Sequence, residues 1–106
     1  MASVSSDWVM EYRDSFHEAY LDALTGLGDC ARARSDYREA VHAYRRALNV
    51  DPYREDIHRA IMLCYAALGQ KQMISVQYDE IRGLLWAELG VEPSDETLRL
   101  AGELLK

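Results

Sequence analysis

Apolar side chains recur at steps of three and four residues along most of this chain, which is the spacing of one face of an α-helix. The pattern predicts helices over about residues 8–31, 36–49, 54–68 and 71–89, and a short fifth helix after residue 94. Strand-like alternation of Val, Ile and Thr is absent from the sequence, so the predicted fold class is all-α. The inward-facing residues are expected to be, helix by helix, Trp8, Tyr12, Phe16, Tyr20, Leu24, Leu27 and Ala31; Tyr37, Ala40, Val41, Tyr44, Ala47 and Leu48; Ile57, Ile61, Cys64, Tyr65 and Leu68; Ile74, Tyr78, Ile81, Leu85 and Trp86; and Leu98, Leu100, Ala101, Leu104 and Leu105.

The predicted helix ends coincide with residues that favour them. Ser6 or Asp7 is placed to cap the first helix. Asp51 and Pro52 end the second helix, because proline removes a backbone donor and disfavours helix in the residue before it. Gly69 is placed to end the third helix in the left-handed conformation.

The segment "ELGVEPS" separates the fourth helix from the fifth. Gly90 is expected in the left-handed conformation, which lets Val91 fold back onto Trp86. Pro93 prevents the helix from continuing, and Ser94 is a favourable N-cap for a new one. We expect the fifth helix to cover the exposed edge of the helices before it.

Two copies of one helix–turn–helix unit follow each other at an offset of 34 residues. The equivalent pairs are Leu27 and Ile61, Cys30 and Cys64, Ala31 and Tyr65, Ala40 and Ile74, Tyr44 and Tyr78, and Ala47 and Ile81. This period resembles that of tetratricopeptide repeats. The eight consensus positions of that repeat are occupied in the first copy by Leu24, Leu27, Gly28, Ala31, Ala40, Tyr44, Ala47 and Pro52. The second copy departs further, with Met62 in place of the glycine.

Small residues in the first copy predict close helix packing. Gly28 and Ala40 are expected where the two helices of the unit cross, and Tyr44 and Tyr78 are expected to fill the space between units. Gly26 and Gly28 each cost about 1 kcal/mol relative to alanine inside a helix, which suggests that another backbone approaches closely there. The predicted architecture is a right-handed stack of two tetratricopeptide-like repeats with a C-terminal capping helix.

The second unit and the segment after it carry a more specific resemblance. The chain resembles the bacterial transcriptional activator domain, the tetratricopeptide-like domain of regulators of the Streptomyces antibiotic regulatory protein type (SARP family). We therefore assign residues 7–106 to this domain and expect residues 1–6 to be a disordered lead-in or a remnant of cloning. The residues that carry the resemblance are Asp51, Pro52, Arg54, Glu55, His58, Arg59, Gly69, Tyr78, Leu84, Leu85, Glu88, Leu89, Gly90, Val91, Glu92, Pro93 and Ser94, with Trp8, Arg13, Phe16, Tyr20 and Leu24 in the first helix.

The resemblance implies a protein–protein interaction or oligomerisation module of a bacterial transcription regulator in the cytoplasm. In that family the domain is joined to a winged-helix DNA-binding domain, a receiver domain or an ATPase module, and we expect none of these within this chain. The implied partners are the attached regulator domains, RNA polymerase or a second copy that makes a homodimer. One alternative is a stand-alone tetratricopeptide-like adaptor or scaffold. Another is a small-molecule sensor with its pocket between the repeats and the cap, near Trp86.

Charge argues against direct nucleic-acid contact, because phosphate binding needs a basic surface and the net charge is −6. Residues 1–30 carry one Arg against six acids, residues 31–78 eight basic residues against five acids, and residues 79–106 three against seven. The basic middle segment could steer an acidic partner, or the charges could simply be a solvated surface. The sequence has no apolar run long enough to span a membrane, and "MASVSS" lacks the features of a signal peptide.

The titratable residues do not form a pattern typical of catalysis or metal binding. Cys30 and Cys64 hold equivalent repeat positions, which seldom bring Cβ atoms together for a disulfide, so we expect two buried free thiols. His58 and Cys64 are six residues apart and point to different helix faces. His17 has no evident nucleophile nearby, and a solvated helix-surface histidine is the default. We predict no enzymatic activity, no metal and no cofactor.

The first helix of each unit is expected to line a concave groove. Two acids near one end, two arginines and a small apolar floor would suit an extended peptide or a partner helix. The same face could instead pack on a neighbouring domain or a second copy. The predicted groove residues are Asp22, Thr25, Asp29, Arg32 and Ala33 from the first unit, and Asp56, Arg59, Leu63, Ala66 and Ala67 from the second.

Overall fold

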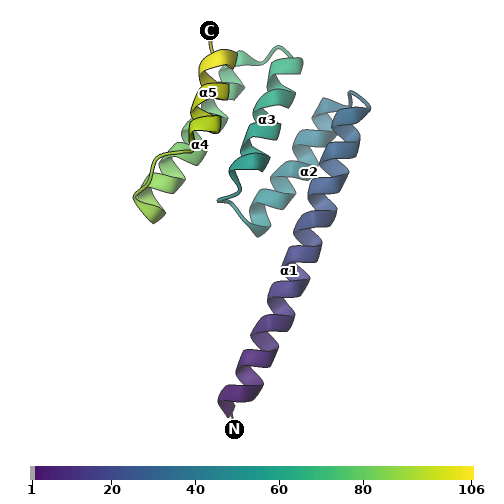
Figure 1. The fold of residues 1–106 in the computed structure, drawn as a ribbon. Coiled ribbons are helices and arrows are strands. Elements are labelled where there is room, and N and C mark those ends of the chain that lie inside the picture. The colour runs from purple at the N-terminus through teal and green to yellow at the C-terminus, as the bar shows by residue number, and fades with distance from the viewer. Residues whose placement is uncertain (1) are drawn as a thin grey trace.

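Five helices make up the chain in a computed structural model that describes the backbone of residues 2–106 and the side chains from residue 15 onward. They are α1 (Ala2–Ala33), α2 (Tyr37–Val50), α3 (Glu55–Ala67), α4 (Lys71–Leu89) and α5 (Asp95–Leu104), with no strand in this described range. α1 pairs with α2 and α3 with α4, and α2 packs on α3, so two helical hairpins stack side by side (Figure 1). The predicted all-α repeat architecture is confirmed.

α1 is longer than predicted, because it begins at Ala2 rather than at a cap on Ser6 or Asp7. Residues 2–7 contain neither glycine nor proline, so nothing in them stops a helix. With 32 residues against the 14 of α2, the N-terminal part of α1 projects past its partner (Figure 1). The assignment of residues 1–6 as a separate lead-in stays a prediction.

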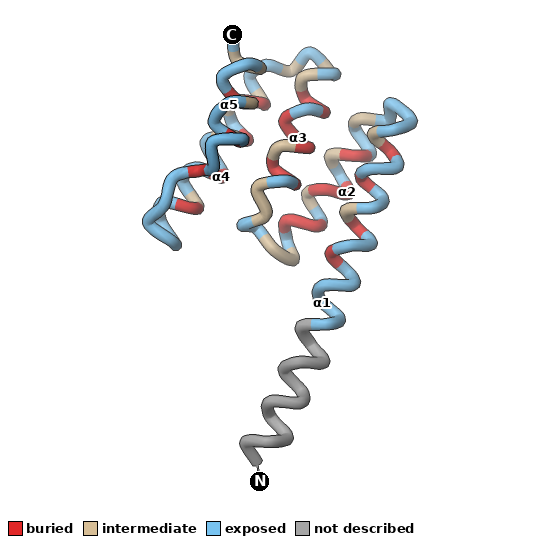
Figure 2. The backbone as a smooth tube through the Cα atoms, viewed as in Figure 1, coloured by how far each residue is buried: buried red, intermediate tan, exposed pale blue. Residues whose placement is uncertain are grey.

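The inward face of α1 matches the predicted stripe only in part. Phe16, Tyr20 and Leu27 are 59%, 46% and 58% exposed, while Trp8 and Tyr12 lie outside the residues whose side chains are described. The buried positions are Leu21, Leu24, Gly28 and Ala31, of which Leu24 and Ala31 were predicted to face inward. Contact with α2 determines which face of α1 is buried, and the buried residues lie in the C-terminal part of α1 (Figure 2).

The core runs through both hairpins and is formed as the periodicity of α2 to α4 predicted, apart from Trp86, which is 63% exposed. In α5 only Ala101 of the expected apolar residues is fully buried, and Leu98 is exposed. Among the largest fully buried side chains, four were not predicted to face inward: His58, Met62, Gln77 and Thr97. Three of these four are polar, and their partners are described below.

Gly28 and Gly26 lie in different environments. A Cβ atom at Gly28 would lie 2.5 Å from the ring of Tyr44, so the close approach is real, but it comes from a side chain and not from a backbone. Around Gly26 nothing lies within 4 Å of such a Cβ atom, so the expected close approach there is wrong. Ala40 is fully buried beside this crossing, as predicted.

Ser35 ends α1 in the left-handed conformation that usually requires glycine, with φ of 64°. The N–H of Ser35 donates to Arg32 O at 2.9 Å and the N–H of Asp36 to Ala31 O at 2.8 Å, which is a Schellman motif. Gly69 closes α3 with the same pair of bonds, as predicted.

Ser35→Gly should therefore raise the free energy of unfolding by about 0.5–1 kcal/mol, because glycine adopts this conformation without the Cβ penalty. Urea denaturation of the two proteins measures the difference. The reverse exchange at the equivalent position, Gly69→Ser, should lower stability by a similar amount. Equal stability of Ser35→Gly and the parent protein would contradict the expectation.

The C-terminal cap forms as predicted, with α5 lying against α3 and α4. Gly90 is left-handed with φ of 64°, and the Ser94 side chain accepts a hydrogen bond from the Thr97 N–H. The expected apolar contact between Val91 and Trp86 buries little, because both side chains remain exposed. The N–H of Val91 donates instead to the carbonyl of Leu85, at 3.4 Å.

Candidate functional site

A hollow of about 250 Å³ between α1 and α3 is the first candidate site. Six of the ten predicted groove residues line it: Thr25, Asp29, Arg32, Asp56, Arg59 and Leu63. Tyr44, Ile57 and Ala60 complete the lining. The other four do not line this hollow, since Asp22, Ala33 and Ala67 are exposed and Ala66 packs against the core. We call the nine lining residues the α1–α3 groove.

Asp29, the acidic residue on the α1 side of the groove, is held in place by the buried Tyr44. The hydroxyl group of the buried Tyr44 donates a hydrogen bond to the Asp29 carboxylate, and Arg32 lies 3.9 Å from the same carboxylate. Burial, followed by this hydrogen bond, raises the pKa of Tyr44 well above its ordinary value. Tyr44 therefore stays a neutral donor that holds Asp29 at the groove surface.

The acid at the α3 side is paired within its own helix turn. Arg54 donates two hydrogen bonds to the Asp56 carboxylate, at 2.9 and 2.8 Å. This pairing lowers the pKa of Asp56 against the opposing effect of burial. Asp56 is therefore ionised at neutral pH, and hydrogen bonds position both groove acids.

Arg59 connects the groove to the capping helix. Its Nη1 atom donates to the Thr97 hydroxyl at 2.8 Å, and its Nη2 atom lies 3.5 Å from Glu96. The Thr97 hydroxyl donates in turn to Glu55 at 2.8 Å, and the Ser94 N–H donates to the same carboxylate at 2.9 Å. We call Glu55, Arg59, Ser94 and Thr97 the cap clamp.

The cap clamp keeps Glu55 ionised. Burial alone would raise the pKa of Glu55, but the hydrogen bonds from Ser94 and Thr97 and the charge of Arg59 lower it below its ordinary value. Sequence reasoning identified Ser94 as a cap but missed the rest, because the partners lie 38 to 42 residues apart in the chain.

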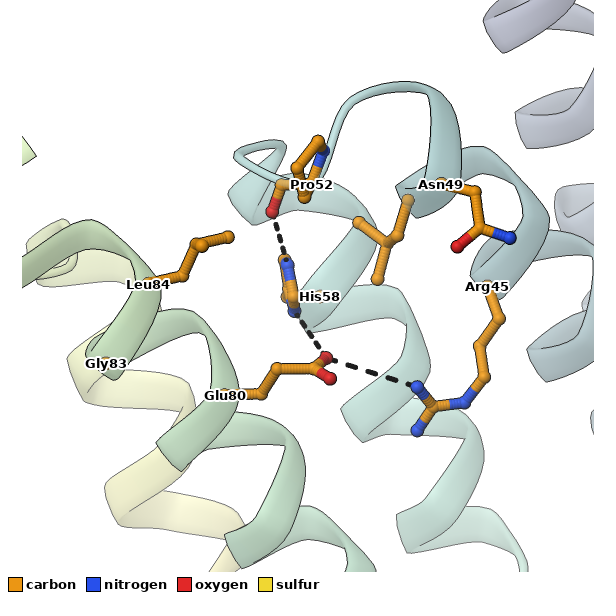
Figure 3. Close-up of a pocket in the computed structure, with 8 residues that line it drawn as sticks. Arg45, Asn49, Pro52, His58, Glu80, Gly83 and Leu84 are labelled. Carbon is orange, nitrogen blue, oxygen red and sulfur yellow. Dashed lines mark hydrogen bonds and ion pairs between the residues drawn. The ribbon is translucent and has the colours of Figure 1, made fainter. Parts of the chain in front are cut away.

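A second and larger cavity, of about 620 Å³, lies between α2 and α4 and has His58 of α3 on its lining (Figure 3). Apolar walls come from both sides of this cavity, and its charged residues are Arg45 on α2 and Glu80 on α4 (Figure 3). The lining residues are Arg45, Leu48, Asn49, Pro52, His58, Glu80, Gly83 and Leu84. We call this space the α2–α4 cavity; the sequence did not predict it.

A buried polar network fixes the side chains next to this cavity. Gln77 accepts a hydrogen bond from Arg45 Nη2 at 2.9 Å and directs its amide nitrogen at His58 Nδ1, 2.6 Å away, and at Glu80 Oε2, 2.8 Å away. Arg45 Nη2 also donates to the Tyr65 hydroxyl at 3.0 Å. Among the described side chains, no buried polar atom lacks a hydrogen-bond partner.

The network selects one state of His58. Its Nε2 atom lies 2.9 Å from the Pro52 carbonyl, which can only accept, so Nε2 carries the proton and Nδ1 accepts from Gln77. Burial lowers the pKa of His58, and this outweighs the attraction of the Glu80 carboxylate, 3.9 Å from Nδ1. His58 is thus neutral in the folded protein at pH 7.

Stability should fall as the pH drops from about 6.5 toward 5. In this range residue 58 is protonated in the unfolded chain but not in the folded chain. The unfolded state therefore binds more protons and is stabilised relative to the folded state. Glu55 and Asp56 also have lowered pKa values, but their protonation reduces stability only at lower pH, below their ordinary pKa values of 4.5 and 3.8. Urea midpoints across this range measure the slope. It should shrink in His58→Gln and persist in His42→Gln, which changes an exposed histidine; the opposite ranking would contradict the assignment.

The cysteines only partly match expectation. Both are free, but Cys30 is exposed rather than buried, because it lies off the face of α1 that meets α2. Cys64 is buried, and burial raises the pKa of its thiol. Over the described residues, no three His, Cys, Asp or Glu side chains come together as a metal site, and no helix is long and apolar enough to cross a membrane.

Two stacked helical hairpins closed by a capping helix place the chain in the class of all-α, tetratricopeptide-like domains. The sequence model of the bacterial transcriptional activator domain matches residues 1–105. The chain therefore belongs to the bacterial transcriptional activator domain family, a regulatory family and not an enzyme family. No curated protein and no solved structure gives a significant match.

Proposed function

We propose that this chain is a protein–protein interaction or oligomerisation module of a bacterial transcription regulator, and that its partner docks in the α1–α3 groove. Family membership supports the link to transcriptional activation. The observation that supports docking is the groove itself, which takes side chains from the first helix of both repeats. A ligand seated there would contact both units at once.

The chemistry of the groove favours a peptide or helix with mixed charge. Asp29 and Asp56 present carboxylates, and Arg32 and Arg59 present guanidinium groups beside them. Leu63 is partly exposed and offers apolar surface between these charges. An anchor side chain over Leu63, flanked by one basic and one acidic residue, would complement this arrangement.

Docking in this groove would affect transcription through a regulator domain attached to this chain. A partner held there would change how a linked DNA-binding or receiver domain is presented to DNA or to RNA polymerase. Because Arg59 belongs both to the groove and to the cap clamp, the position of α5 would respond to what occupies the groove.

Leu63→Arg should weaken partner binding at least about tenfold, because it places a charge in the centre of the docking surface. Binding of RNA polymerase and of regulator DNA-binding and receiver domains is measured by biolayer interferometry, and self-association by analytical ultracentrifugation. The matched control is Val76→Arg, which makes the same change at an exposed position of α4 outside the groove. Loss in both variants, or in neither, would contradict docking in the groove.

A further inference from the structure

The α2–α4 cavity is separate from the proposed docking groove. It is built from the second helix of each repeat, whereas the groove is built mainly from the first helices, and the two linings share no residue. Its volume of about 620 Å³ lies within the roughly 300–1,000 Å³ that is typical of small-molecule sites. The groove, at about 250 Å³, is smaller than that range.

The walls of the cavity are apolar, and one of them is opened by a glycine. Leu48 lines the cavity from α2. Pro52 lies on the same side, and Leu84 lines the side of α4 (Figure 3). Gly83 lies inside α4, where glycine costs about 1 kcal/mol relative to alanine. Nothing lies within 4 Å of a Cβ atom built on Gly83, so packing does not require glycine there, and a side chain would occupy space that is now open.

The polar end of the cavity presents a donor and an acceptor side by side. Arg45 Nη1 lies 4.0 Å from Glu80 Oε2, too far for a hydrogen bond, so the two groups face each other with unused hydrogen-bonding capacity. Gln77 holds both of them, because it accepts from Arg45 Nη2 and donates to Glu80. A fixed guanidinium and a fixed carboxylate at this distance match a ligand group that accepts and donates at neighbouring atoms.

We propose that the α2–α4 cavity binds a small amphipathic molecule without net charge, whose apolar body lies against Leu48, Pro52 and Leu84 and whose carboxamide-like head accepts from Arg45 and donates to Glu80. A carboxylate head would be attracted by Arg45 but repelled by Glu80, and an ammonium head the reverse, so a neutral donor–acceptor head is the one that gains from both groups. Such a molecule bridges the two repeats. This function needs no protein partner and stands whether or not the groove docks one.

Three probes that share one six-carbon body test this match: hexanamide, hexanoate and hexylammonium. Each is titrated into the ¹⁵N-labelled chain, and the backbone amide signals of Asn49, Gly83 and Leu84 are followed by NMR. We expect saturable shifts of these signals with hexanamide, and binding at least about tenfold weaker for both charged probes. Absence of a saturable shift up to the solubility limit of hexanamide, or equal affinity for all three probes, would overturn the proposal.

Two variants assign the binding to the cavity. Gly83→Leu fills the open wall and should weaken hexanamide binding at least about tenfold, whereas Gly102→Leu adds the same side chain at an exposed glycine of α5 and should leave it unchanged. Glu80→Gln keeps an acceptor but removes the negative charge, so hexanoate should gain affinity relative to hexanamide. Equal weakening by the two leucine variants, or no gain for hexanoate, would reject the site, and the Glu80→Gln test holds even if Gly83→Leu does not fold.

Discussion

Gly28→Ala should lower the free energy of unfolding by about 1–3 kcal/mol, although alanine is the better helix former. The added Cβ atom would lie 2.5 Å from the ring of Tyr44, which is fully buried and hydrogen-bonded to Asp29. The ring is held by its burial and its hydrogen bond, so α1 and α2 must separate or Tyr44 must leave its rotamer. Denaturation in urea, followed by circular dichroism at 222 nm, measures the loss.

Gly26→Ala is the matched control for this change, two residues away in the same helix. Nothing lies within 4 Å of its new methyl group, so only helix propensity acts and stability should rise by up to about 1 kcal/mol. Opposite signs for the two variants are therefore expected. If both stabilise the protein, the close contact with Tyr44 does not govern the crossing of α1 and α2.

Gln77→Leu should cost about 1–3 kcal/mol of stability, although leucine has nearly the same volume and is apolar. The substitution removes the donor to His58 Nδ1 and the acceptor for Arg45 Nη2. His58 is buried, so its Nδ1 atom would remain without a partner and without water. Arg45 is partly exposed and can recover hydration, so the cost arises mainly at His58.

The comparison for this prediction is Gln72→Leu, the same exchange at an exposed position of α4. It should change stability by no more than about 0.5 kcal/mol. A double-mutant cycle between Gln77→Leu and His58→Leu should show strong coupling, since either change alone disrupts the same hydrogen bond. Additive effects would mean that the amide and the imidazole do not act together.

Sequence periodicity predicted the helices of this fold well where packing is local. The order of the five helices, the end of α3 at Gly69 and the Ser94 cap all follow from residues within a turn or two of each other. The orientation of α1 was harder to predict. Phe16, Tyr20 and Leu27 form an apolar stripe in the sequence, but which face is buried depends on where α2 crosses.

The polar part of the interior could not be predicted from periodicity. His58, Gln77 and Thr97 are buried because each is satisfied by a partner from another segment, such as Arg45, 32 residues before Gln77, or Glu55, 42 residues before Thr97. A polar residue at a helical position is normally assigned to the solvent face. The repeat register placed six of the groove residues on one hollow, but it gave no indication of the α2–α4 cavity, whose lining mixes charged, polar and apolar residues.

The cap clamp also sets the order in which this stack comes apart. α5 packs mainly on α3 and α4, and its buried residues are Thr97 and Ala101. Arrays of helical units are held by nearest-neighbour contacts and fray from their ends, so we expect α5 to be lost before α3 and α4. Its attachment depends on the Glu55 carboxylate and on Arg59, so protonation of Glu55, below its ordinary pKa of 4.5, weakens the attachment and uncovers the face of α3 and α4 beneath α5.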